Sequence, residues 1–193
     1  MCIRLVERVS LALVLTVCMV VAAYAQGYPQ TFVFGQSATQ SDIATVDIAI
    51  PGDGKGLPMG KGDYVTGKQV YDRTCAACHG AKLEGVANIP NMPSGGALRL
   101  IGGRGTLTQR RPVLTVESYW PYATTLFDYI RRAMPFNAPG SLTADEIYAV
   151  SAFILAEAKI IDKSTVLDAT TLPKIQMPNR DGFIPDPRPE MFK

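Results

Sequence analysis

Cys75-Ala76-Ala77-Cys78-His79 is the stretch of sequence that decides the fold. Two cysteines separated by two residues and followed directly by a histidine have the spacing of a c-type haem attachment site. One helical turn between the cysteines places both sulfurs under the two vinyl groups of a haem, and the next residue offers its imidazole to the iron. The motif therefore predicts that Cys75 and Cys78 bind one haem covalently and that His79 is an axial ligand of its iron.

A redox pair, a zinc site and a chance match all fit this motif less well. A thioredoxin-like redox pair follows a strand in a βαβ unit, whereas a glycine-rich loop and a helical pattern precede Cys75. A closed zinc site needs four ligands, and His79 is the only histidine in the chain. A chance match does not account for the export pattern that accompanies the motif. Haem attachment is the interpretation that the residues favour.

The first 25 residues have the pattern of a secretory signal peptide. Arg4 and Arg8 precede the apolar run 9–23, and Ala23-Tyr24-Ala25 has the small-x-small form of a cleavage site. An uncleaved membrane anchor is the alternative, but a run of about 15 residues is shorter than the roughly 20 that span a bilayer. We expect cleavage before Gln26 and a periplasmic location, where cysteine pairs tend to oxidise.

Cleavage would also decide the cysteine count and the charge. Cys2 and Cys18 would leave with the signal peptide, so that only the motif cysteines remain. A lipoprotein signal at Cys18 is disfavoured because Val17 stands where such a signal needs a small residue. The net charge would be near +1 instead of the +2 of the whole chain. This balance argues against a nucleic-acid partner, and after cleavage we expect no membrane attachment.

Met134 is the predicted second axial ligand of the haem iron. It follows the helical run 123–133 and precedes Pro135, and the turn-rich stretch 137–140 then leads into the last helix. A rigid loop at this place can press the thioether sulfur onto the iron. Such a ligand favours ferrous iron, which predicts a comparatively high reduction potential and a blocked sixth position.

The other methionines of the expected mature chain are less suitable. Met92 lies only 13 residues after His79, too near to reach the opposite face of the haem. Met177 and Met191 lie in a proline-rich tail, and Met59 fits the common role of methionine as core filler.

Hydrophobic spacing predicts three helices. The first covers about 65–77 and enters the motif, with Gly67 allowing another helix to approach closely. A second starts at Pro121 and carries Leu126 and Ile130 toward the core. A third begins at Thr143, because Thr143-Ala144-Asp145-Glu146 has the form of a capping box. The predicted class is all-α, a cytochrome c fold of about three to five helices around one covalent haem, with extended arms at both ends.

Four segments make up the expected organisation: a signal peptide at 1–25, an N-terminal extended arm at 26–63, the haem domain at 64–160, and a proline-rich C-terminal arm at 161–193. The C-terminal arm mixes its prolines with apolar side chains, unlike an inert linker. It therefore either wraps its own domain or docks on a partner.

Buried haem propionates need hydrogen-bond donors, which one side chain of the glycine-rich loop after the motif and two side chains beside the helix at Pro121 could supply. Arg104, Trp120 and Tyr122 are these candidates, although a surface charge at Arg104 and core packing of Trp120 are the plainer alternatives. By position, we expect the carbonyl group of Pro90 to orient His79 through its second ring nitrogen.

Several stretches resemble the cytochrome subunit of sulfane dehydrogenase. They cover most of the expected mature chain and are more specific than the haem motif alone. The stretches are Phe34-Gly35-Gln36, Gly56-Leu57-Pro58, Gly102-Gly103-Arg104-Gly105-Thr106-Leu107, Ser118-Tyr119-Trp120-Pro121-Tyr122-Ala123-Thr124-Thr125-Leu126-Phe127-Asp128-Tyr129-Ile130-Arg131-Arg132-Ala133-Met134-Pro135 and Met177-Pro178-Asn179-Arg180-Asp181-Gly182-Phe183.

The resemblance implies a non-catalytic electron-transfer subunit in sulfur oxidation. Its partner would be a molybdenum-cofactor protein of the sulfite oxidase type, embraced by the two arms, and a downstream c-type cytochrome would take the electrons. Some members of that family carry a second haem domain, which this chain lacks, so a sulfite dehydrogenase partner stays open. A free-standing electron carrier and a haem enzyme acting on thiosulfate or peroxide are the alternatives, and the near-neutral charge does not support the carrier.

Overall fold

The computed structural model describes residues 35–90 and 96–184. The predicted signal peptide, its cleavage site before Gln26, Met92 and Met191 lie outside these ranges. The chain divides into two compact units, one up to Val46 and one from Asp47 onward. In the first unit, the short helix α2 (Gln40–Val46) begins after Thr39, and the side chains and backbone of Thr39 and Asp42 hydrogen-bond each other at its start.

The second unit is mainly helical, as the all-α prediction requires. Its helices are α3 (Tyr64–Thr74), α4 (Ala76–His79), α5 (Ala123–Ala133), α6 (Ala144–Glu157) and the 3-10 helix η1 (Leu172–Lys174). Two small antiparallel sheets accompany them, one of β1 (Lys61–Gly62) with β4 (Leu167–Asp168), the other of β2 (Val86–Ala87) with β3 (Gly96–Ala97). Lys61 faces Asp168 in the first sheet, and Val86 faces Ala97 in the second.

Two of the three predicted helix starts are confirmed by their caps. The Asp63 carboxylate accepts a hydrogen bond from the Thr66 N–H at 2.8 Å at the start of α3. At the start of α6, Thr143 and Glu146 form the predicted capping box. The prediction that a helix starts at Pro121 was wrong, because α5 begins at Ala123 and has Tyr122 as its N-cap.

The helix that enters the motif is not continuous, contrary to the prediction of one helix over 65–77. It ends at Thr74, and a separate turn, α4, begins at Ala76. Cys75 lies between them with φ −119° and ψ −38°, far from helical φ, while its N–H still donates to the Tyr71 carbonyl at 2.8 Å. The break therefore falls on the first cysteine of the motif.

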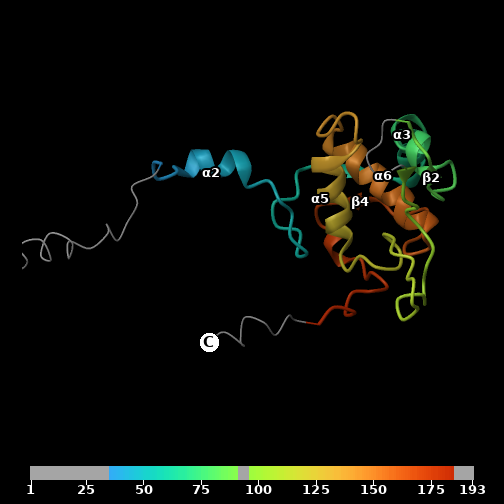
Figure 1. The fold of residues 1–193 in the computed structure, drawn as a ribbon. Coiled ribbons are helices and arrows are strands. Elements are labelled where there is room, and N and C mark those ends of the chain that lie inside the picture. The colour runs from blue at the N-terminus through green and yellow to red at the C-terminus, as the bar shows by residue number, and fades with distance from the viewer. Residues whose placement is uncertain (1–34, 91–95, 185–193) are drawn as a thin grey trace, which may run out of the picture. The chain divides into compact units, whose positions relative to one another are not determined.

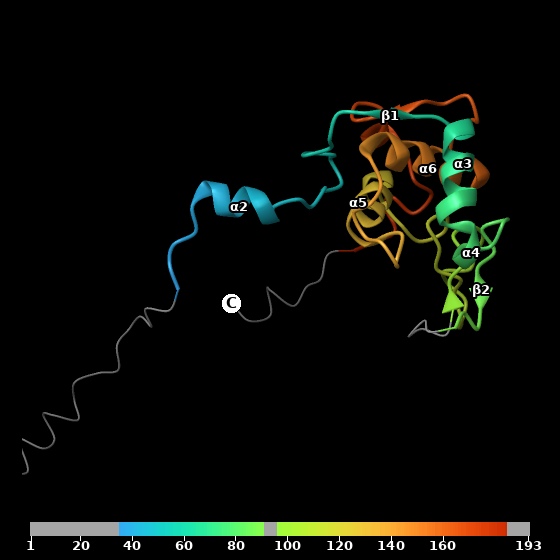
Figure 2. The ribbon, with the colours of Figure 1, turned by 90° about the horizontal axis from the view of Figure 1, so that it is seen from above.

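Helix α6 lies between α3 and α5 in both ribbon views (Figures 1 and 2). At the contact with α3, Gly67 meets the backbone of Ala149, which confirms the predicted close approach. The Phe153 ring fills the space beside it, with its centroid 5.3 Å from that of Tyr64 and 5.0 Å from that of Tyr71. A fully buried aromatic pair, Phe127 and Tyr148, joins α5 to α6 at 4.5 Å.

Segments on both sides of the helices complete the core. Ile50 comes from before α3, and Leu167, Leu172 and Met177 come from after α6, and all four are buried. The β1–β4 pairing holds the segment before α3 beside the segment after α6. Figure 2 labels β1. As far as Met177, the C-terminal arm therefore wraps its own domain, the first of the two alternatives. Within the ranges that the structure describes, no helix is long and apolar enough to cross a membrane.

Candidate haem site

The haem motif is a single helical turn with two available thiols. The N–H groups of Cys78 and His79 both donate to the Cys75 carbonyl, at 3.1 and 2.9 Å. Cys75 and Cys78 are free and partly buried, so neither sulfur is held in a disulfide. Burial raises the pKa of the Cys75 thiol, opposed by a contact of its sulfur with the Thr74 hydroxyl at 3.4 Å. Two thiols one turn apart, followed by an imidazole, are the donor set that a covalent haem needs.

His79 is oriented by a backbone carbonyl. Its Nδ1 lies 2.9 Å from the oxygen of Leu98. A carbonyl oxygen only accepts hydrogen bonds, so Nδ1 carries the proton and donates, which leaves the Nε2 lone pair for a metal ion. Such a bond to the second ring nitrogen is how metal-bound histidines are usually held. The side chain therefore fits an axial ligand.

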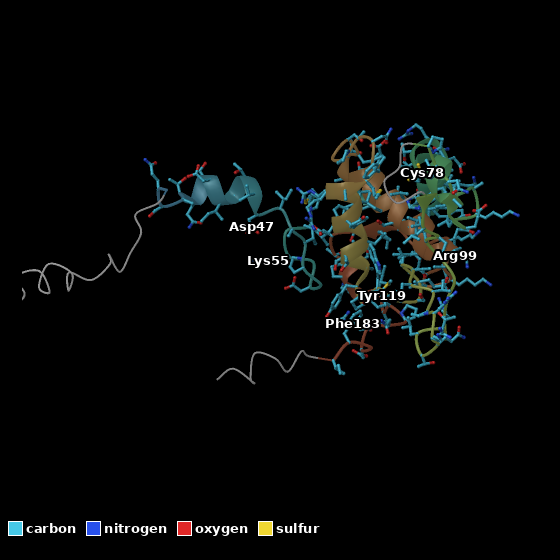
Figure 3. The ribbon with its side chains drawn as sticks, in the orientation of Figure 1. Asp47, Lys55, Cys78, Arg99, Tyr119 and Phe183 are labelled. Carbon is cyan, nitrogen blue, oxygen red and sulfur yellow. The ribbon has the colours of Figure 1, made fainter. Side chains whose placement is uncertain are left out.

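The expectation that Pro90 supplies this carbonyl was wrong. After His79 the chain folds back, with the Gly85 N–H donating to the His79 carbonyl at 2.7 Å. The β2–β3 pairing then returns the chain, and Leu98 follows β3 directly. Gly85 has φ +79°, and a Cβ there would come within 2.6 Å of the Arg99 nitrogen, so glycine permits the return. Figure 3 labels Cys78 and Arg99 on the side of the domain that carries α3 and β2.

Met134 occupies the end of α5. It is the C-cap residue of that helix, with its N–H donating to the Ile130 carbonyl at 3.1 Å. Its side chain is half-buried and packs against the hydrophobic core. A thioether at a helix end beside the core is suited to ligate iron, since the helix fixes its backbone.

Two other methionines differ from what their sequence positions suggested. Met59, expected as core filler, is 93% exposed, so that expectation was wrong. It stands in the turn before β1, where the chain runs over the surface. Met177, which the sequence placed in a proline-rich tail, is only 3% exposed and belongs to the core. The tail that wraps the domain carries it there.

The three propionate candidates have different neighbours. Arg104 is paired with Glu117, with 2.6 Å between Nε and Oε1, and donates from a terminal nitrogen to the Ala158 carbonyl at 2.7 Å. Trp120 is half-buried, with its ring 5.7 Å from that of Tyr129 in an edge-on contact.

Tyr122 is half-buried at the N-cap of α5. The guanidinium carbon of Arg180 lies 4.6 Å from its ring centroid. Nearby, the Asn179 amide donates to the Tyr119 carbonyl at 2.7 Å, and the Phe183 ring meets Tyr119 edge-on at 5.2 Å (Figure 3). The C-terminal arm thus covers the stretch that leads into α5.

Sequence reasoning missed two residues at this site, Leu98 and Glu117. Leu98 acts through its main-chain carbonyl, which the identity of a side chain does not reveal. Glu117 accepts a hydrogen bond from the Gly102 N–H at 2.5 Å in addition to its pairing with Arg104, and no motif marks it. Among the residues described, no group of three or more His, Cys, Asp or Glu side chains is arranged to hold a metal ion.

Comparisons with known proteins identify the family to which this fold belongs. A family model described as "Cytochrome c" matches residues 64–157, a span that includes the motif and Met134. Among solved structures, the chain is similar to one titled "Crystal Structure of the Sulfane Dehydrogenase SoxCD from Paracoccus pantotrophus". The two chains are 37% identical with a TM-score of 0.70, over 83% of this chain and 75% of that one. No curated protein sequence matches the chain.

Proposed function

This chain belongs to the c-type cytochromes, among those that resemble the cytochrome subunit of sulfane dehydrogenase, and we propose that it relays electrons from a molybdenum-cofactor dehydrogenase through one haem. The cytochrome c domain implies a covalently bound haem c and an electron-transfer role. The observation that carries the proposal is the bond between His79 Nδ1 and the Leu98 carbonyl beside two free thiols. That arrangement leaves two thiols for the thioether bonds and the Nε2 lone pair of His79 for the iron.

Four residues hold the haem in this proposal. Cys75 and Cys78 would form the two thioether bonds, and His79 through Nε2 and Met134 through its sulfur would hold the iron. The haem would supply one-electron chemistry when bound. The thioether of Met134 would favour ferrous iron and would keep substrates away from it.

The propionates would be bound from the stretch before α5. Trp120 offers its indole N–H and Tyr122 its hydroxyl, and both side chains are half-buried there. Arg104 has five donors, of which Glu117 and the Ala158 carbonyl engage two nitrogens, so the remaining ones are available to a carboxylate.

A molybdenum enzyme that oxidises sulfane or sulfite sulfur is the proposed electron donor, and a downstream c-type cytochrome the acceptor. The likeness to a sulfane dehydrogenase structure supports this partner. The proposed boundaries are an N-terminal arm at 26–63, the haem domain at 64–160 and a C-terminal arm at 161–193. Phe183 and Ile184, 49% and 89% exposed, offer apolar contact area near the end of the C-terminal arm.

Export completes the proposal. The signal peptide at 1–25 would direct the chain to the periplasm, where the haem would be attached and the partner bound. We propose no nucleic-acid partner and no membrane attachment after cleavage. A free-standing carrier is the competing function, as is a haem enzyme acting on thiosulfate or peroxide, which requires an open or reactive iron site.

Purification from the native host tests the proposal. A tagged chain should carry one haem per polypeptide and should bring down a molybdenum-containing protein in equal amount. Purification of the haem protein alone would favour the free-standing carrier. Absence of the methionine-to-iron absorption band in the oxidised protein would favour a haem enzyme.

A further inference from the structure

The loop from Leu98 to Gly103, here called the carbonyl loop, connects His79 to the segment before α5. At its start, the Leu98 carbonyl accepts the His79 Nδ1–H at 2.9 Å. In its middle, the Leu100 N–H donates to the Leu83 carbonyl at 2.9 Å, and the Leu100 carbonyl accepts from the Val116 N–H at 3.1 Å. The loop is therefore tied both to the chain just after the haem motif and to the segment before α5.

Glu117 fixes the far end of the carbonyl loop. One carboxylate oxygen accepts the Gly102 N–H at 2.5 Å, and the other lies 2.6 Å from Arg104 Nε. The Glu117 side chain is 13% exposed, so little water competes for these bonds, which are strengthened by the charge of the carboxylate. The same loop end is held on its carbonyl side by the Thr115 hydroxyl, which donates to the Gly102 carbonyl at 2.7 Å.

Arg104 connects this clamp to α6. Its terminal nitrogen donates to the carbonyl of Ala158, the C-cap residue of the helix, at 2.7 Å. Glu117 and Ala158 also line a shallow cavity of about 300 Å³, together with Glu157. Glu157 pairs with Lys163 at 2.9 Å and accepts the Tyr64 hydroxyl at 2.7 Å. Three carboxylates, those of Glu84, Glu117 and Glu157, thus border one cavity, and of these three Glu117 is the one that accepts a hydrogen bond from the carbonyl loop.

We infer that Glu117 is a positioning residue for His79, acting through the carbonyl loop, with Arg104 holding Glu117 in place. The inference rests on the proposed ligation of haem iron by His79. A firm hydrogen bond from Nδ1 to the Leu98 carbonyl makes the imidazole a stronger donor, which stabilises ferric iron. Loosening the clamp weakens that bond, so it should raise the reduction potential.

The experiment compares holoprotein of the full chain with Glu117→Ala and Glu117→Gln variants, using Glu157→Gln as the matched control. Proton NMR measures the exchange rate of the His79 Nδ1–H, and a redox titration measures the potential. Glu117→Ala should speed the exchange and raise the potential. In Glu117→Gln both the exchange rate and the potential should be close to the wild-type values, because the amide oxygen still accepts the Gly102 N–H. The Glu157→Gln control should match the wild type.

The Gln variant separates positioning from plain electrostatics. Both Glu117 variants remove the same negative charge, so a purely electrostatic effect would raise the potential equally in both and would leave the exchange rate unchanged. That result would overturn the inference, as would wild-type exchange and potential in Glu117→Ala. Should Glu117→Ala give no holoprotein, Arg104→Met loosens the clamp from its other side and should shift both readouts in the same direction by less. Wild-type protein without His79 ligation would instead contradict the proposed function.

Discussion

Gly67 of α3 lies directly against Ala149 of α6, so closely that a Cβ at position 67 would come within 1.9 Å of the Ala149 carbonyl oxygen. The opposing atoms belong to the backbone of a buried helix, which cannot rotate away as a side chain can. This contact fixes the distance between α3, which leads into the haem motif, and α6. It therefore determines where the motif lies relative to the core.

Gly67→Ala should destabilise the domain, because the two helices must separate to admit the methyl group. Overpacking of this kind typically costs about 1–3 kcal/mol, and a clash with backbone belongs at the upper end. Urea unfolding of the holoprotein measures the loss. Val65→Ala, on the same helix at a side chain that is 66% exposed, should leave the midpoint nearly unchanged. Equal midpoints for the two variants would show that the helices do not meet at Gly67.

Met134→Ala should leave the haem attached but remove its second axial ligand. The methionine-to-iron absorption band should disappear, and the potential should fall by a sizeable part of the range of about 0.8 V over which axial ligands set haem potentials. Visible spectra and a redox titration measure both effects. Met59→Ala, at a side chain that is 93% exposed, is the control and should change neither. An intact band in Met134→Ala would refute the assignment.

Ser151→Ala should stabilise the domain slightly. The Ser151 hydroxyl is fully buried in α6, and it is the buried side-chain polar atom that lacks a hydrogen-bond partner within the described part of the chain. An unsatisfied buried hydroxyl costs roughly 1–3 kcal/mol, so we expect a gain of about 1 kcal/mol after loss of packing. Thermal unfolding of the holoprotein measures it. A lower melting temperature would mean that the hydroxyl does have a partner.

Features that depend on the residue types at a position, such as helix caps, could be predicted from the sequence. Contacts between backbone groups that are far apart in the sequence could not. The capping box at Thr143 joins residues three apart, and the missing side chain of Gly67 marks a place where another helix can approach; both predictions are confirmed. The carbonyl that binds His79 belongs to Leu98, 19 residues away, and becomes available only because the β2–β3 pairing folds the chain back. Spacing alone pointed to Pro90, since no side chain marks a carbonyl acceptor.

Burial in the flanking arms escaped prediction for the same reason. Met177 was set aside as part of a proline-rich tail that would either wrap the domain or dock on a partner, and it is buried because η1 and the β1–β4 pairing hold that tail on the core. Met59 looked like core filler and is exposed. The break of the motif helix at Cys75 has only a weak local signal, because Thr74 and Cys75 are modestly poor helix formers and the break contains neither glycine nor proline.

Asp128→Asn should reduce stability at neutral pH and flatten its dependence on pH. Burial raises the pKa of the Asp128 carboxyl, but hydrogen bonds from Arg132 and from the Ile50 N–H at 2.9 Å outweigh this effect, so the pKa lies below 3.8. A lowered pKa in the folded state stabilises the domain above about pH 4, and this contribution is lost as the pH falls through the folded value.

The size of the effect follows from the geometry. Asp128 is 7% exposed and ties the segment before α3 to α5, whereas its partner Arg132 is 44% exposed, so the ion pair itself contributes little. We expect a loss of about 1 kcal/mol near pH 7. Urea midpoints between pH 7 and acid pH should converge for wild type and variant once the carboxyl is protonated. Asp72→Asn, at an exposed pair with Lys68, should follow the wild type throughout. If the urea midpoints of wild type and Asp128→Asn differ by the same amount down to acid pH, the loss of stability comes from packing and not from the charge.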